Sequence, residues 1–134
     1  MGRWLELDHT ADLALHVWGR DLTDLFVAAA TGMFSLLAEA APGGVRVRFE
    51  MHLTAPDAES LLVDWLNELL YLCETQDFVG TEFVFAILTP MELHAEVAGL
   101  PVGERRADIK AATYHMLAVV AAEAGYETEI VFDV

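Results

Sequence analysis

The sequence has 134 residues, a formal net charge of −15 and 55% hydrophobic residues, so a strongly acidic surface accompanies a large apolar content. A chain of this length buries about two-thirds of its surface on folding, and we expect a single domain over residues 1–134. The apolar content excludes a disordered acidic tail. The longest uncharged stretches, residues 25–38 and 111–122, are shorter than the roughly 20 residues that cross a bilayer.

Charge and cysteine content restrict the partners and the compartment. The lone cysteine, Cys73, excludes an intrachain disulfide, and no apolar leader follows Met1, so we expect a cytoplasmic protein. One lysine, Lys110, and two small arginine pairs are too few for direct contacts with nucleic-acid phosphates. An acidic surface is instead attracted to basic protein patches or to cations. We therefore expect neither direct nucleic-acid binding nor membrane association.

The first half of the chain predicts strands and one helix. Apolar residues alternate over residues 12–19, after a shorter apolar piece at residues 4–7, which indicates a strand with one buried face. Residues 22–40 have helical spacing, with Asp21 as the N-cap and a Pro-Gly-Gly stop. Alternation returns over residues 45–53, which predicts a strand with one apolar and one solvated face.

The second half begins with another helix. This helix starts near Asp57, which can act as its N-cap, and ends near Gln76. Residues 82–88 and 92–98 alternate on either side of a turn and predict a hairpin. Residues 100–108 have the composition of a loop and indicate a mobile excursion.

The last quarter of the chain is less regular. Residues 109–123 are ambiguous, because their alanines favour helix while their Thr, Tyr and Val favour strand, and we prefer strand. Residues 127–132 are strand-like. The predicted order gives an α+β domain in which two main helices pack on mainly antiparallel sheet.

Oxygen-bearing residues gather in the turn before the residue 12–19 strand and after the last strand. The carboxylates of Asp8 and Asp12 and the hydroxyl of Thr10 fall within five residues, together with the imidazole of His9, and Asp133 follows the last strand directly. Side-chain to backbone hydrogen bonds within a turn explain the first group without any ligand. Hard cations such as calcium or magnesium prefer several oxygens of this kind, so a shared cation site is the alternative.

The histidines do not form a local metal motif. His9, His16, His52, His94 and His115 are dispersed, and no two share a helical face. A common histidine site would therefore need convergence of distant segments. We interpret His16, His52 and His94 as surface residues of strands and His115 as a hydrogen-bonded structural residue.

The second helix carries a pair of carboxylates. Asp64 and Glu68 share a face because they lie four residues apart. Such pairs can act as acid and base when burial separates their pKa values. The simpler interpretation is a solvated acidic face, which could also dock a basic partner. Cys73 lies at an apolar position of this helix and predicts a core residue, and the sequence has no Gly-rich phosphate loop or serine-nucleophile motif.

Five separated stretches together resemble the archease family. They are residues 8–12 (DHTAD), 28–34 (AAATGMF), 60–72 (SLLVDWLNELLYL), 109–115 (IKAATYH) and 130–134 (IVFDV). The resemblance spans nearly the whole chain in order and departs at residues 99–108, a segment that is longer in other members. It implies two nested strand-helix-strand-strand modules, with the inserted module at about residues 45–98, and it favours strand for residues 109–123.

The resemblance also implies a function. Archeases are accessory activators of the RtcB-type RNA-splicing ligase: they promote guanylylation of the ligase's active-site histidine by GTP and allow multiple turnovers in tRNA splicing. It implies a non-catalytic protein with a divalent-cation site, calcium being the expected ion, at Asp12, Asp133 and the main chain of Val134. We expect this acidic end to dock at the basic active-site region of the ligase.

Further residues are candidates for contacts with the partner or for support of the cation site. They are Asp8, His9, Asp64, Glu68, Lys110 and His115. Two other classes of function remain open. A metal-dependent hydrolase, with His9 or Glu68 as base near a cation at Asp12, predicts turnover by the isolated protein. A chaperone-like or small-molecule-binding module predicts an exposed hydrophobic cleft.

Overall fold

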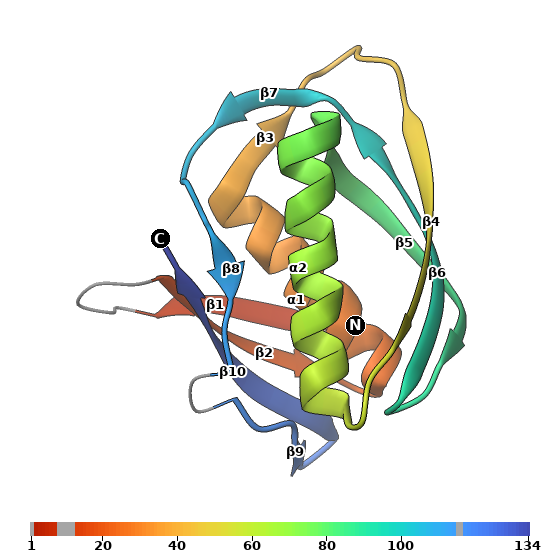
Figure 1. The fold of residues 1–134 in the computed structure, drawn as a ribbon. Helices are drawn as coiled ribbons and strands as arrows, with labels where there is room; N and C mark the ends of the chain where they lie inside the picture. The colour runs from red at the N-terminus through yellow and green to blue at the C-terminus, as the bar shows by residue number, and fades with distance from the viewer. Residues whose placement is uncertain (1, 8–12, 115–116) are drawn as a thin grey trace.

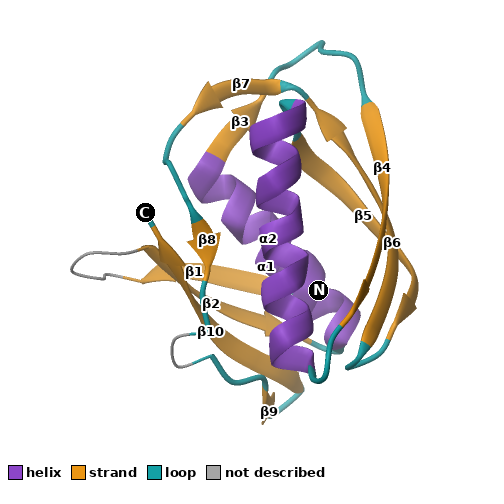
Figure 2. Cartoon of the chain, viewed as in Figure 1, coloured by secondary structure: helices purple, strands orange, loops and turns teal. Residues whose placement is uncertain are grey.

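The computed structural model describes residues 2–7, 13–114 and 117–134, in which two helices lie between antiparallel sheets (Figures 1 and 2). The helices are α1 (Leu22–Leu37) and α2 (Ala58–Gln76). The strands are β1 (Arg3–Leu7), β2 (Leu13–Gly19), β3 (Ala38–Ala40), β4 (Val47–Thr54), β5 (Val79–Leu88), β6 (Glu92–Leu100), β7 (Val102–Arg105), β8 (Ala111–Ala112), β9 (Val120–Ala122) and β10 (Gly125–Asp133). The predicted α+β class is confirmed.

The larger sheet joins distant parts of the chain. Its order is β1-β2-β10-β8, and β9 also pairs with β10. Phe132 of β10 lies opposite Leu13 of β2 on one side and opposite Ala112 of β8 on the other. This antiparallel register brings the start of β2, the short strand β8 and the end of β10 to the same edge of the molecule.

The second sheet is built from one continuous part of the chain. Its order is β4-β6-β5, and α2 connects β4 to β5. The two strands that flank this part, β3 and β7, pair with each other in a separate two-stranded sheet. The segment that forms the β4-β6-β5 sheet is therefore inserted between parts of the other sheet, because β2 and α1 precede it in the chain and β10 follows it.

The core lies where α1 and α2 cross between the sheets. The buried Trp65 of α2 donates its indole N–H to the carbonyl of Phe26 in α1, at 3.1 Å. The Trp65 ring also lies 5.8 Å from the Phe83 ring and 4.9 Å from the Phe85 ring of β5. Aromatic burial of this kind contributes both area and specific ring geometry. A single side chain thus joins both helices to the β4-β6-β5 sheet.

The predicted helix starts are confirmed by their caps. Asp21 accepts a hydrogen bond from the backbone N–H of Asp24 at 2.8 Å, and Asp57 accepts one from Ser60 at 2.7 Å. These carboxylates satisfy backbone donors that the first helical turn leaves free. The predicted stop of α1 is several residues late, because the helix ends at Leu37 and the chain continues directly into β3.

Two other predictions need correction. The predicted mobile loop at residues 100–108 contains β7, whose Arg105 and Glu104 pair with β3, and the backbone N–H of Arg106 donates to the carbonyl of Leu37 at 2.9 Å. The predicted strand at residues 109–123 is present, within the described residues, only as β8 and β9. Neither described helix combines the length and apolarity needed to span a membrane.

Candidate functional site at the end of β10

The end of β10 is held by backbone hydrogen bonds to the segment that contains β8. The backbone N–H of Lys110 donates to the carbonyl of Asp133 at 2.8 Å, and that of Thr113 donates to the carbonyl of Val131 at 3.0 Å. The Asp133 side chain is exposed and has no hydrogen-bond or ion-pair partner among the described residues. Val134, next in the chain, is also exposed. At the end of β10, a backbone that is held by hydrogen bonds therefore carries an exposed carboxylate.

Helix α2 holds the other side of β8. The Asn67 side chain accepts a hydrogen bond from the backbone N–H of Ala112 at 2.8 Å and donates to the carbonyl of the same residue at 3.3 Å. Further along, a Glu59 carboxylate oxygen accepts from the backbone N–H of Val119 at 2.9 Å. The roles of Asn67 and Glu59 were missed by sequence reasoning. The sequence signal that could have indicated the role of Asn67 is its position as a polar side chain beside the apolar stripe of the helix.

The two predicted carboxylates of α2 lie on the same helix as Asn67. Asp64 and Glu68 are both half-buried. Burial raises the pKa of the Asp64 carboxyl above its ordinary value, since a charged group is less well solvated there. Neither carboxylate forms an ion pair with any described residue. Asp64 thus keeps its charge at an energetic cost, which is more common at functional positions than elsewhere.

Several predicted site residues lie outside the described residues, namely Asp8, His9, Asp12 and His115. The described register of the larger sheet ends with Leu13 opposite Phe132. Of the predicted cation ligands, the structure therefore describes Asp133 and Val134. The exposed Asp133 carboxylate and the main chain of Val134 offer oxygen atoms, which are the ligand type that a hard cation such as calcium prefers.

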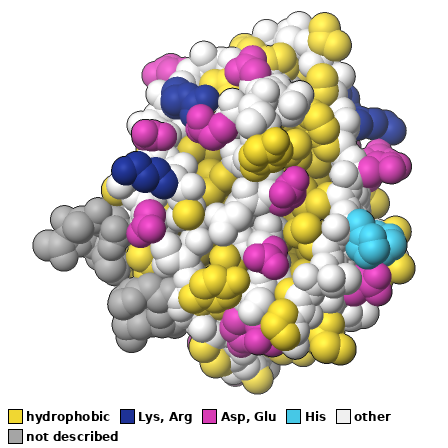
Figure 3. Space-filling model, in the orientation of Figure 1, with side chains coloured by type: hydrophobic (Ala, Val, Ile, Leu, Met, Phe, Trp, Pro, Cys, Tyr) yellow, Lys and Arg dark blue, Asp and Glu magenta, His cyan; other side chains and the backbone are white. Residues whose placement is uncertain are grey.

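Among the charged side chains on the surface around the candidate site, carboxylates outnumber basic groups. In Figure 3, Asp and Glu side chains are spread over the face that α2 occupies, and Lys and Arg are few. Five arginines are engaged by carboxylates, in the pairs Arg20–Asp24, Arg46–Glu82, Arg48–Glu96, Arg105–Glu74 and Arg106–Glu39. Arg3 lies over the Trp18 ring. Because most positive charges have a nearby negative partner, the remaining field is negative.

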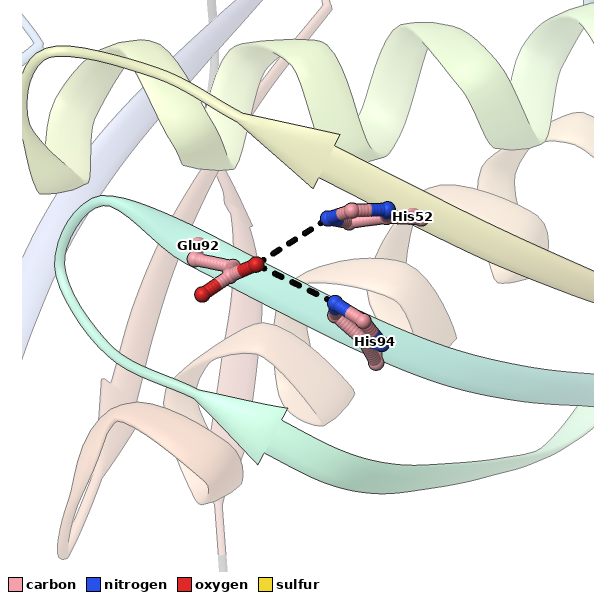
Figure 4. Close-up of side chains that lie close together, drawn as sticks. All are labelled: His52, Glu92 and His94. Carbon is pink, nitrogen blue, oxygen red and sulfur yellow. Dashed lines mark hydrogen bonds and ion pairs between the residues drawn. The ribbon is translucent and has the colours of Figure 1, made fainter.

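A second group of ligand-type side chains lies on the β4-β6-β5 sheet (Figure 4), away from the end of β10 (Figure 1). Nε2 of His52 is 3.0 Å, and Nε2 of His94 is 3.1 Å, from the same Glu92 oxygen. Among the described residues, this is the group of His, Cys, Asp or Glu side chains that could hold a metal ion. His52 and His94 are surface residues as predicted, but the structure brings them together.

Comparisons with known proteins identify the fold and the family. The sequence profile of the Archease protein family matches residues 4–134. The protein archease of Methanosarcina mazei is 33% identical over 136 residues, which cover 96% of this chain and 93% of that protein. The chain belongs to the archease family. The archease of Sulfolobus acidocaldarius, 29% identical over 139 residues, matches along the full length of both chains.

Solved structures agree with this archease assignment. The solution structure of a Methanobacterium thermoautotrophicum protein superposes with a TM-score of 0.71 and 28% sequence identity, covering 99% of this chain and 98% of that one. The crystal structure of a Thermotoga maritima protein, described as an archease and possible chaperone, also gives a TM-score of 0.71, at 19% identity over 96% and 94% of the two chains. The second likeness shows the fold alone.

Proposed function

We propose that this archease activates an RtcB-type RNA ligase without itself catalysing a reaction. It promotes guanylylation of the ligase by GTP and so allows multiple turnovers, as the family resemblance implies. The observation that carries the proposal is the match to the archease family over residues 4–134. The exposed Asp133 carboxylate at the end of β10 supports it, because it gives the acidic protein a defined point of contact.

A divalent cation, calcium being the ion we expect, would be held by Asp12, Asp133 and the main chain of Val134. Bound there, the cation would supply a local positive charge that neutralises carboxylates and fixes their oxygens. The protein's own contribution is positional. The hydrogen bond from Lys110 to the carbonyl of Asp133 fixes the backbone that presents the Asp133 side chain.

The partner is proposed to be the ligase protein, with the RNA bound by the ligase alone. Net charge −15 favours approach to the basic nucleotide-binding region of a ligase, and most arginines here are already engaged by carboxylates. Lys110 directly precedes β8, which pairs with the end of β10, and Asp64 and Glu68 lie on α2, which holds β8 through Asn67. These three residues are proposed partner contacts. Association of this type weakens as ionic strength rises.

The test is single-turnover guanylylation of the ligase in GTP, with wild type, Asp12→Ala and Asp133→Ala. We expect both variants to slow guanylylation at least tenfold. Glu104→Ala is the matched control, because it removes the same charge from an exposed position of β7, away from β10, and should keep the wild-type rate. Wild-type rates from both aspartate variants, with folding verified by circular dichroism, would contradict the role of the cation site.

The same preparation discriminates the alternative functions. The activator predicts multiple turnovers of the ligase only when the archease is present, and no reaction by the archease alone. Substrate hydrolysis by the isolated protein would instead favour the metal-dependent hydrolase. Protection of unrelated proteins from aggregation, without any effect on ligase guanylylation, would favour the chaperone-like module.

A further inference from the structure

We propose that His52, Glu92 and His94 form a second metal site, specific for zinc or a similar transition-metal ion, on the outer face of the β4-β6-β5 sheet. The site is independent of the proposed cation site at the end of β10. Its ligands would be one nitrogen from each imidazole and one oxygen from the carboxylate, and a water molecule would complete the coordination.

The strands place all three side chains on one face. His52 of β4 lies directly opposite His94 of β6 in the antiparallel ladder. Glu92 and His94 are two residues apart on β6, so their side chains project from the same side of the sheet. The ladder fixes these relations through the backbone, and eight register pairs join β4 to β6. The three ligands are thus positioned by regular structure and not by a loop.

The distances between the three ligand atoms are close to those found around a bound zinc ion. The two imidazole nitrogens lie 3.0 and 3.1 Å from one Glu92 oxygen, and the ligand atoms of the three side chains all lie within 4.8 Å of one another. With zinc–ligand bonds of about 2.0–2.1 Å, tetrahedral ligands are about 3.3 Å apart. Small rotations of exposed side chains would therefore create the coordination sphere without backbone movement.

The donor types select the ion. Two imidazoles and one carboxylate suit zinc, copper or nickel, whereas calcium and magnesium prefer oxygen ligands throughout. Hydrogen bonds from His94 and His52 hold the pKa of the Glu92 carboxyl below its ordinary value, so the carboxylate is charged at neutral pH. Each imidazole would bind zinc through the nitrogen that now faces this oxygen, in the neutral form that carries its proton on the other ring nitrogen.

The site is accessible and leaves room for a fourth ligand. The side chains of His52, Glu92 and His94 are between 40% and 56% exposed. A hollow of about 440 Å³ begins at His52 and His94 and extends toward Glu50, Glu96 and Val84. Because His52 and Glu92 belong to different strands, a bound ion would bridge β4 and β6. The ion would stabilise the folded chain, since it binds the unfolded chain less well.

The test is a zinc titration of the full chain in competition with a chromophoric zinc chelator. We expect one zinc ion per chain from this site in wild type, and at least about a tenfold loss of affinity in His52→Ala and in His94→Ala. His16→Ala is the matched control: His16 is a half-buried histidine of β2 that also contacts one carboxylate, Glu127, at 3.3 Å, but has no second imidazole beside it in the described chain. It should bind zinc as wild type does.

Two further readouts make the result decisive. In imidazole nitrogen NMR, zinc should shift the signals of His52 and His94 together at one equivalent, and Asp133→Asn should leave these shifts unchanged. Glu92→Gln keeps the side-chain shape and should weaken zinc binding without unfolding. The proposal is overturned if wild type binds no zinc at micromolar concentrations, if His52→Ala and His94→Ala bind as wild type does, or if Asp133→Asn abolishes the shifts.

Discussion

The side chain of Asn67 offers a direct test of how the candidate site is held. Its amide makes both the 2.8 Å and the 3.3 Å hydrogen bond to the backbone of Ala112, a residue that is only 4% exposed. Substitution Asn67→Ala removes both bonds and leaves a buried N–H and carbonyl without their partner. Each such hydrogen bond contributes about 0.5–1.5 kcal/mol to the free energy of unfolding. The upper part of this range applies here, because the backbone groups that lose their partner stay buried.

The helix propensity of alanine acts in the opposite direction. Alanine in a helix is more favourable than asparagine by about 0.6 kcal/mol. The expected net loss in the free energy of unfolding is therefore about 2 kcal/mol. Asn67→Asp keeps the acceptor for the Ala112 N–H but loses the donor, and it adds a charge near Asp64, so we expect a loss of similar size.

Urea unfolding of wild type and Asn67→Ala measures this loss, and hydrogen exchange of the Ala112 amide locates it. Exchange at Ala112 should accelerate strongly, while exchange in the β4-β6-β5 sheet should change little. Glu68→Ala is the matched control on the same helix, because Glu68 has no hydrogen bond or ion pair with the described residues. A loss below about 0.5 kcal/mol, the size of an ordinary surface substitution, together with a protected Ala112 amide would refute the reasoning.

Two further predictions concern carboxylates whose pKa values are shifted in opposite directions. The hydrogen bond from the Arg20 guanidinium lowers the pKa of Asp24 to about 2, against an ordinary value of 3.8. The pairing therefore stabilises the fold fully above pH 3.8, and this stabilisation is lost as the pH falls to about 2. A carboxyl carbon NMR titration should show this midpoint in wild type and a higher one in Arg20→Gln; equal midpoints would contradict the assignment. Burial raises the pKa of Asp64 above its ordinary value of 3.8. The charged carboxylate therefore lowers the free energy of unfolding, and this destabilisation is complete above the raised pKa. It disappears as the pH falls below 3.8, where the carboxyl is protonated in both the folded and the unfolded chain. Asp64→Asn should therefore raise the melting temperature at pH 7 but not at pH 3, and if Asp64 contacts the ligase the same variant should slow guanylylation; a lower melting temperature at pH 7 would show that the carboxylate is stabilising.

Sequence patterns were sufficient where local chemistry determines the structure. Asp21 and Asp57 mark the helix starts because an acidic N-cap satisfies backbone donors of the first turn, an interaction that spans only three residues. The alternation in β2 and β10 likewise follows from one buried face. Periodicity failed for β7, because Pro101 and Gly103 indicate a loop while a few backbone hydrogen bonds to β3 suffice to make a short strand.

The histidine group shows a different limit. His52 and His94 are separated in the chain by α2 and β5, and their approach depends on the pairing of β4 with β6. No turn of fixed length connects these two strands, so the residues alone do not specify their register. The cation site at Asp12, Asp133 and Val134 stays a prediction from the family resemblance, whereas the imidazole pair became visible only with the sheet in place.

The pairing of β2 with β10 also affects how the protein assembles. Leu13 and Phe132 are neighbours in the sheet but more than a hundred residues apart in the chain. The β4-β6-β5 sheet is formed by a continuous segment, so its loops are shorter and its closure costs less chain entropy. We therefore expect the histidine-bearing sheet to form early in folding, and the aspartate-bearing edge to appear only after the large loop between β2 and β10 has closed.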